Sequence, residues 1–196
     1  MNNTPHTNCL TLRLLHASKG YKAVAFDIFD TLLKRDCARP ADLFALMEVT
    51  HQAALGFAEA RVAAEAETRQ TLGREVTLAE IYAHPALRGT DPAAECAAEL
   101  AMIAPNRPVA QAAAACHARG QKVYAVSDMY LPKEQIEAML QKCGLDFLDG
   151  VFVSCEYGVQ KRSGKLFKLF LQQTALRPAE VLFVGDSPRA DFAGAA

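Results

Sequence analysis

Polar side chains that could take part in chemistry follow four short apolar segments of the sequence. Asp27 comes directly after the first segment and Ser127 directly after the second. Lys161 follows the third, and Asp186 follows the fourth, with Asp191 five residues further on. The set comprises a carboxylate, a hydroxyl, an ammonium group and a pair of carboxylates. Polar groups at the carboxyl ends of buried strands lie where α/β proteins bind their ligands, so these positions form the candidate site.

The four apolar segments have the pattern of buried parallel strands. They are rich in valine and phenylalanine and continuously apolar rather than alternating, which is typical of strands covered on both faces. The predicted strands comprise residues 22–26, 122–126, 150–153 and 180–184. Helical patterns separate the last three, as right-handed crossovers require. The sequence therefore predicts an α/β fold, with a parallel Rossmann-like sheet and helices on both faces.

A long helical stretch separates the first predicted strand from the second. Residues 36–105 show no convincing strand but carry several helix start signals. These signals are Pro40, Gly56, the capping-box pair Thr77 and Glu80, and Asp91 before Pro92. We therefore predict an N-terminal loose tail at 1–20, a core of 21–35 and 106–196, and an inserted all-helical cap at 36–105.

Composition narrows the class of protein. Hydrophobic residues make up 51% of the 196 residues and charged residues 22%, which is an ordinary globular balance. The net charge of −1 gives no reason to expect a nucleic-acid partner. No apolar run is long enough to cross a membrane, and the six cysteines form no CxxC pair. We expect a cytoplasmic protein without membrane association; nothing in the sequence specifies an oligomeric state.

The four motifs together resemble those of the haloacid dehalogenase (HAD) superfamily, which includes many phosphatases. The run FDIFDT at residues 26–31 resembles the first motif, and Ser127, Lys161 and Gly185-Asp186 with Asp191 resemble the others in order. The resemblance extends from about Tyr21 to the end of the chain. The helical insertion after the first motif is similar to the cap of that family.

The resemblance implies a role for each site residue. Asp27 would be the nucleophile that forms a covalent intermediate. Mg²⁺ would bind Asp27, the backbone carbonyl of Phe29 and Asp186, with Asp191 helping directly or through water. Ser127 would donate a hydrogen bond to a phosphoryl oxygen, and Lys161 would hold the nucleophile and the substrate charge together. A shared metal requires Asp27 and Asp186 side by side, which predicts the strand order fourth-first-second-third.

Phe29 departs from the pattern of the family's phosphatases, which usually carry a second aspartate there as general acid and base. Asp30 occupies the next position, where glycine is usual in the family. Three interpretations follow: Asp30 substitutes as the catalytic acid and base, the substrate has a good leaving group, or the protein is slow or inactive. Haloacid dehalogenases themselves carry an aromatic residue at this position. A second departure is the end of the chain at Ala196, which indicates either a minimal four-stranded core or a piece of a longer protein.

Each motif taken alone also has a purely structural interpretation. Asp27 could be a turn residue and Ser127 a cap. Asp186 and Asp191 could cap a helix, and Lys161 lies in a cluster with Arg162 and Lys165 that could be a solvated face.

Three functions remain as hypotheses. The first is a Mg²⁺-dependent phosphatase acting on a small phosphorylated metabolite. The second is a metal-independent hydrolase similar to 2-haloacid dehalogenases. The third is a catalytically impaired domain that binds a phosphorylated ligand or a partner protein.

Overall fold

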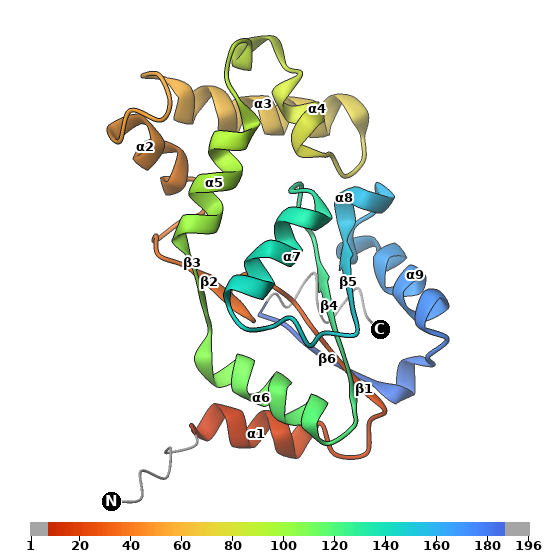
Figure 1. Cartoon of the computed structure of the whole chain (residues 1–196). Coiled ribbons are helices and arrows are strands. Elements are labelled where there is room, and N and C mark those ends of the chain that lie inside the picture. Colours follow the sequence, from red (N-terminus) through yellow and green to blue (C-terminus); the bar gives the residue numbers. More distant parts are fainter. Residues whose placement is uncertain (1–7, 187–196) are drawn as a thin grey trace, which may run out of the picture.

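The computed structural model of the chain describes residues 8–186. Within this range a four-stranded parallel sheet has the order β5-β4-β1-β6 (Figure 1). The strands are β1 (Ala23–Phe26), β4 (Lys122–Ser127), β5 (Gly150–Val153) and β6 (Val181–Val184). The four predicted strands and their order are therefore confirmed.

Helices cover both faces of the sheet, as the continuous burial of its strands requires. Val24 and Phe26 of β1 pack in one hydrophobic cluster, and Ala25, which points to the opposite face, packs in another. The first cluster includes side chains of α6 (Arg107–Ala118) and α7 (Lys133–Lys142), and the second includes those of α9 (Lys165–Thr174). The Rossmann-like layering predicted from the sequence is present.

The N-terminal segment differs from the prediction. Cys9–Ala17 forms helix α1, which packs against α6. Thr11 is buried and its hydroxyl donates a 2.8 Å hydrogen bond to the carbonyl of Pro108, whereas Arg13 and His16 are exposed. The prediction of a loose tail is wrong for these residues, because Leu14 and Leu15 pack against the hydrophobic core while the interrupting Arg13 and His16 stay exposed.

The predicted cap region contains helices that begin close to the expected signals. They are α2 (Asp42–Val49), α3 (Phe57–Leu72), α4 (Leu78–Tyr82), the 3₁₀ turn η1 (Pro85–Leu87) and α5 (Pro92–Met102). The capping box is confirmed: Glu80 N–H donates to Thr77 Oγ1 at 3.2 Å, and Thr77 N–H donates to Glu80 Oε2 at 2.9 Å.

A short antiparallel ribbon joins these helices to the sheet. It pairs β2 (Leu33–Arg35) with β3 (Ile103–Pro105). The expectation that residues 36–105 contain no strand is therefore corrected at its C-terminal end. A strand of three residues is too short to show the alternation by which strands are predicted.

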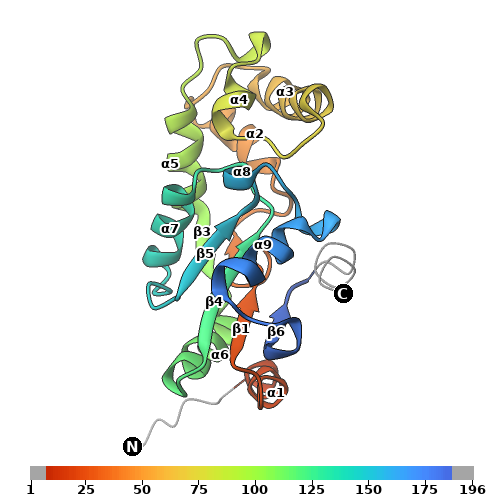
Figure 2. The ribbon, with the colours of Figure 1, turned by 90° about the vertical axis from the view of Figure 1, so that its right-hand side faces the viewer.

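Figures 1 and 2 show α2 to α5 gathered at one end of the molecule, with α1 and α6 at the other. The loop that follows β4 and the short helix α8 (Ser154–Tyr157) that follows β5 lie on the side of these cap helices. The carboxyl ends of the central strands thus face the cap. Among residues 8–186, no helix combines the length and hydrophobicity that a bilayer crossing requires.

Candidate active site

Asp27 lies at the carboxyl end of β1 and is 7% exposed. Its backbone N–H donates to the carbonyl of Val184, at 2.8 Å, so it continues the pairing of β1 with β6. Two side chains donate to its Oδ1: Ser127 Oγ at 3.1 Å and Lys161 Nζ at 2.7 Å. Ser127 and Lys161 of the candidate site therefore meet at one carboxylate oxygen of Asp27.

Lys161 is the lysine of its cluster that enters the site. It begins the 3₁₀ turn η2 (Lys161–Ser163), and its side chain is 4% exposed, whereas Arg162 and Lys165 are exposed. Its backbone N–H donates to Asp128 Oδ1 at 2.8 Å. Because a buried ammonium group is costly unless it is paired, the Asp27 carboxylate accounts for this burial. The charge pattern alone does not distinguish Lys161 from Arg162 and Lys165; the resemblance to the HAD superfamily does.

Asp186 follows β6, the strand adjacent to β1. The register places Phe26 opposite Val184, so Asp27 and Asp186 leave the sheet at the same edge, one and two residues beyond that pair. Asp191 lies outside the described residues. Of the Mg²⁺ ligands that the resemblance implies, Asp27 and Asp186 thus follow neighbouring strands, and Phe29 lies on the loop after β1.

The donor set fits a hard cation, because carboxylate and carbonyl oxygens are the ligands that Mg²⁺ prefers. Within residues 8–186, no three His, Cys, Asp or Glu side chains lie close enough together to hold a metal. The expected set differs from such a cluster, since it uses a backbone carbonyl and includes Asp191.

The loop after β1 holds Phe29 and Asp30 in different settings. Phe29 is partly buried, and the Arg35 guanidinium carbon lies 4.0 Å from the centroid of its ring. Asp30 is exposed and adopts a left-handed backbone with φ of 59°. Glycine adopts this conformation most easily and aspartate tolerates it, which explains physically why glycine is usual at this position in the family that the motif resembles.

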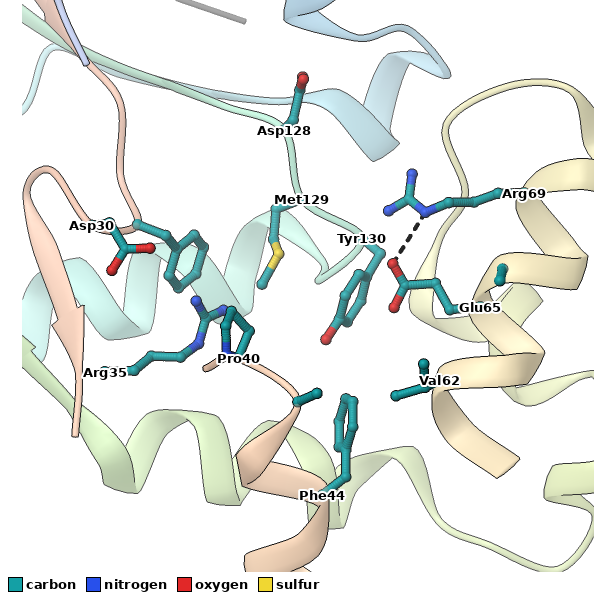
Figure 3. A pocket seen from close by; sticks show the side chains of 13 residues that line it. Asp30, Arg35, Pro40, Phe44, Val62, Glu65, Arg69, Asp128, Met129 and Tyr130 are labelled. Atoms are coloured by element: carbon teal, nitrogen blue, oxygen red, sulfur yellow. Dashed lines mark hydrogen bonds and ion pairs between the residues drawn. The ribbon is translucent and has the colours of Figure 1, made fainter. Parts of the chain in front are cut away.

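A cleft of about 540 Å³ lies between the cap helices and the strand ends (Figure 3). Arg69, Glu65 and Val62 of α3 line one side. Figure 3 shows Asp30 and Arg35 on the opposite side, with Met129 and Tyr130 between the two. The cleft therefore combines apolar and aromatic surface with charged groups from both lobes.

Asp128 is a functional candidate that the sequence analysis missed. It follows Ser127, is partly buried and lines the cleft. Burial raises the pKa of Asp128 from its ordinary 3.8 to about 6, although the hydrogen bond from Lys161 N–H opposes the shift. The sequence did offer one signal for Asp128 as a site residue, because it directly follows Ser127 at the end of a predicted strand. A carboxyl group with such a pKa can exchange protons near neutral pH.

The family model of the haloacid dehalogenase-like hydrolases matches residues 21–196. The chain therefore belongs to the haloacid dehalogenase-like hydrolase family. No curated protein sequence matches the chain significantly.

Solved structures of similar fold include both phosphatases and dehalogenases. A HAD phosphatase from Thermococcus onnurineus is 21% identical with a TM-score of 0.61, covering 89% of this chain and 81% of that chain. L-2-haloacid dehalogenase from Xanthobacter autotrophicus, with chloropropionic acid covalently bound, is 23% identical with a TM-score of 0.58, covering 89% and 73%. A HAD hydrolase from Bacillus subtilis bound to magnesium is 18% identical with a TM-score of 0.59, covering 89% and 84%. These likenesses establish the fold alone.

Proposed function

We propose that this chain is a Mg²⁺-dependent phosphatase that uses Asp27 as its nucleophile on a small phosphorylated metabolite. The observation that carries the proposal is the Asp27 carboxylate at the end of β1, bound by Lys161 and Ser127, with Asp186 following the adjacent strand. A buried carboxylate fixed by two donors has a defined orientation, and a nucleophile needs one.

In the proposed reaction a carboxylate oxygen of Asp27 attacks phosphorus. A new bond forms between Asp27 and phosphorus while the bond to the leaving oxygen breaks, and water then hydrolyses the resulting acyl phosphate. Lys161 and Ser127 stabilise negative charge on the transferring group. Mg²⁺, held by Asp27, the Phe29 carbonyl and Asp186, with Asp191 helping, would neutralise phosphoryl charge when bound.

The proposed reaction needs a proton donor for the leaving group. Phe29 cannot donate one, so substrates with acidic leaving groups should react faster than alkyl phosphates. Phe29→Asp should raise the rate on alkyl phosphates by up to ~10²–10⁴, the usual contribution of general acid and base catalysis. If Asp30 already supplies the proton, Asp30→Asn lowers that rate and Phe29→Asp adds little. Steady-state rates on p-nitrophenyl phosphate and on an alkyl phosphate distinguish these outcomes.

Dehalogenation is the second candidate, and the aromatic Phe29 favours it. A halide leaves without a proton, so carbon–halogen cleavage needs neither an aspartate at this position nor a metal. The similarity in fold to L-2-haloacid dehalogenase is compatible with this chemistry. A third candidate is a domain without turnover that binds a phosphorylated ligand.

The deciding experiment compares p-nitrophenyl phosphate with a haloacid, each in Mg²⁺ and in EDTA. Phosphate release that requires Mg²⁺ supports the proposal and excludes the dehalogenase. Halide release in EDTA without phosphate release excludes the phosphatase. If neither substrate turns over but a phosphate analogue raises the melting temperature, by the mass action of binding to the folded state, the chain is a binding domain.

A further inference from the structure

The cap contacts the catalytic lysine loop at a point remote from the ribbon that joins it to the core. Glu75 lies in the cap loop between α3 and α4 and is 1% exposed. Its Oε2 accepts a 2.9 Å hydrogen bond from Gln160 Nε2. Gln160 directly precedes Lys161 in the chain. A buried carboxylate of the cap therefore binds the residue next to the lysine that pairs with Asp27.

Glu75 is itself held in place by the wall of the cleft. Its Oε1 pairs with Arg69, which also donates to Glu65 at 3.1 Å. Arg69 and Glu65 both line the cleft (Figure 3). A continuous series of polar contacts thus runs from the cleft wall through Arg69, Glu75 and Gln160 to the loop of Lys161. Displacing a buried carboxylate from such partners is costly, which gives the contact a fixed geometry.

The lysine loop is held from both lobes. From the core, Asp128 Oδ1 accepts from the backbone N–H of Lys161 at 2.8 Å. From the cap, Glu75 accepts from Gln160, and three residues later Leu78 N–H donates to the carbonyl of Tyr130 at 2.8 Å. Residues 75–78 of the cap therefore contact two core segments: the loop after β4, at Tyr130, and the loop between α8 and η2, at Gln160. Gln160 and Lys161, which are neighbours in the chain, are therefore bound by carboxylates of different lobes.

We propose that Glu75 is a positioning residue that acts through Gln160 to hold Lys161 against Asp27. Full engagement of Lys161 then requires the hydrogen bond between Glu75 of the cap and Gln160 of the lysine loop. This inference rests on the proposed function of the Asp27 site. The competing interpretation is that Glu75 serves only to balance Arg69 inside the cap.

The first test is the substitution Gln160→Ala. It removes the side-chain amide that donates to Glu75 and leaves the ion pair of Arg69 and Glu75 in place. Amide hydrogen exchange in residues 158–164 should become roughly 10-fold faster, and kcat on p-nitrophenyl phosphate should fall roughly 10-fold to 100-fold, as expected for the loss of a hydrogen bond to a charged group. KM should change much less, because the loop positions the reacting groups rather than the remote part of the substrate. Gln172→Ala, an exposed glutamine on α9, is the matched control and should change neither quantity.

The second test uses Glu75 itself. Glu75→Gln keeps an acceptor for Gln160 and should retain most of kcat, whereas Glu75→Ala should lower kcat as much as Gln160→Ala does. The double variant Glu75→Ala/Gln160→Ala should be no slower than either single variant, since both remove one contact. Unchanged exchange in residues 158–164 and unchanged kcat in Gln160→Ala would overturn the proposal, and so would faster exchange with unchanged kcat.

The exchange measurement separates this inference from the proposed function. If the wild-type chain hydrolyses neither p-nitrophenyl phosphate nor a haloacid, the proposed function fails. Faster exchange at Lys161 in Gln160→Ala still supports the positioning of the loop by Glu75 in that case, and unchanged exchange rejects it.

Discussion

Two buried pairs of a cation and a carboxylate lie in different lobes of this molecule. In the cap, Arg61 and Glu95 are both fully buried and form two hydrogen bonds, at 2.7 and 2.9 Å. Tyr82 donates to the same glutamate at 2.9 Å, and the guanidinium lies 4.7 Å from the ring centroid of Tyr130. At the strand ends, Lys161 and Asp27 are almost as deeply buried, but the lysine and Ser127 both donate to one carboxylate oxygen.

The difference teaches that burial of an ion pair does not by itself identify a site. The cap pair is bidentate and enclosed by aromatic rings, so its donors and acceptors match one another in a fixed geometry. The core pair lies at the carboxyl ends of parallel strands, beside a cleft and a second carboxylate, Asp128. We interpret the first pair as structural and the second as catalytic, and substitutions in each should affect different quantities.

The largest effect should come from Asp27→Asn. The amide is a poor nucleophile of nearly the same size, so turnover should fall by roughly 10⁴–10⁶, as for removal of a nucleophile in other hydrolases. Far-UV circular dichroism should show a retained fold. Asp146→Asn, at an exposed position, is the matched control. Wild-type turnover by purified Asp27→Asn would disprove the assignment of the nucleophile.

Breaking the cap pair should instead lower stability. Arg61→Ala leaves the Glu95 carboxylate buried without its cation, which should reduce the free energy of unfolding by about 3–5 kcal/mol. The double variant Arg61→Met/Glu95→Leu should recover much of that loss, since apolar side chains of similar volume often replace a buried pair without cost. Chemical denaturation measures both. A loss of turnover in the double variant with unchanged stability would contradict the structural role.

Lys161→Ala should lower turnover by roughly 10²–10³, the usual cost of removing one group that stabilises developing charge. Lys165→Ala is the control, because this lysine of the same cluster is exposed. The rates of both variants on p-nitrophenyl phosphate show which of the two lysines has the catalytic role. If Lys165→Ala is the damaging substitution, the catalytic role belongs to Lys165.

The smallest effect concerns Asp128, the second carboxylate beside Lys161. Its folded-state pKa of about 6 lies above the ordinary value of 3.8. The stability that its protonated form contributes is therefore complete below about pH 4 and is lost as the pH rises through 6. Asp128→Asn carries no such titration, so its stability relative to wild type should increase by about 1–3 kcal/mol between pH 4 and pH 7.5. Urea unfolding at the two pH values measures this, and a constant difference would contradict the raised pKa.

The sheet and the central contacts of the site could be predicted because each follows from a local pattern. Buried parallel strands are continuously apolar and their carboxyl ends meet at one edge, so Asp27 and Ser127 could be expected together, whereas Lys161 was singled out from its charged cluster by the resemblance to the HAD superfamily. The motif also identified Asp30 as the residue at the position where glycine is usual in the family, but it did not predict the left-handed backbone of Asp30. The strand order itself came from the same resemblance, because a metal shared by Asp27 and Asp186 requires their strands to be neighbours.

Other features depend on contacts that no local pattern encodes. Thr11 of α1 is buried where its hydroxyl donates to the carbonyl of Pro108, a contact between residues far apart in the sequence. Glu75 resembles any charged loop residue until the cap is placed on the core, and its partner Gln160 is far away in the sequence. The raised pKa of Asp128 likewise arises from its burial in the folded chain.

The β2–β3 ribbon gives the cap the mechanics of a lever. Both crossings between the lobes pass through this ribbon, and Figure 1 shows it on one side of the molecule, with α4 and α8 on the other. A rotation of the cap about the ribbon would therefore displace α4, and the loop with Glu75 that precedes it in the chain, more than the part of the cap beside the ribbon. The two hydrogen bonds between Arg35 of β2 and Glu99 of α5, at 2.9 and 3.1 Å, stiffen the pivot. A rotation of the cap too small to change the ribbon itself would therefore still lengthen the hydrogen bond between Gln160 and Glu75.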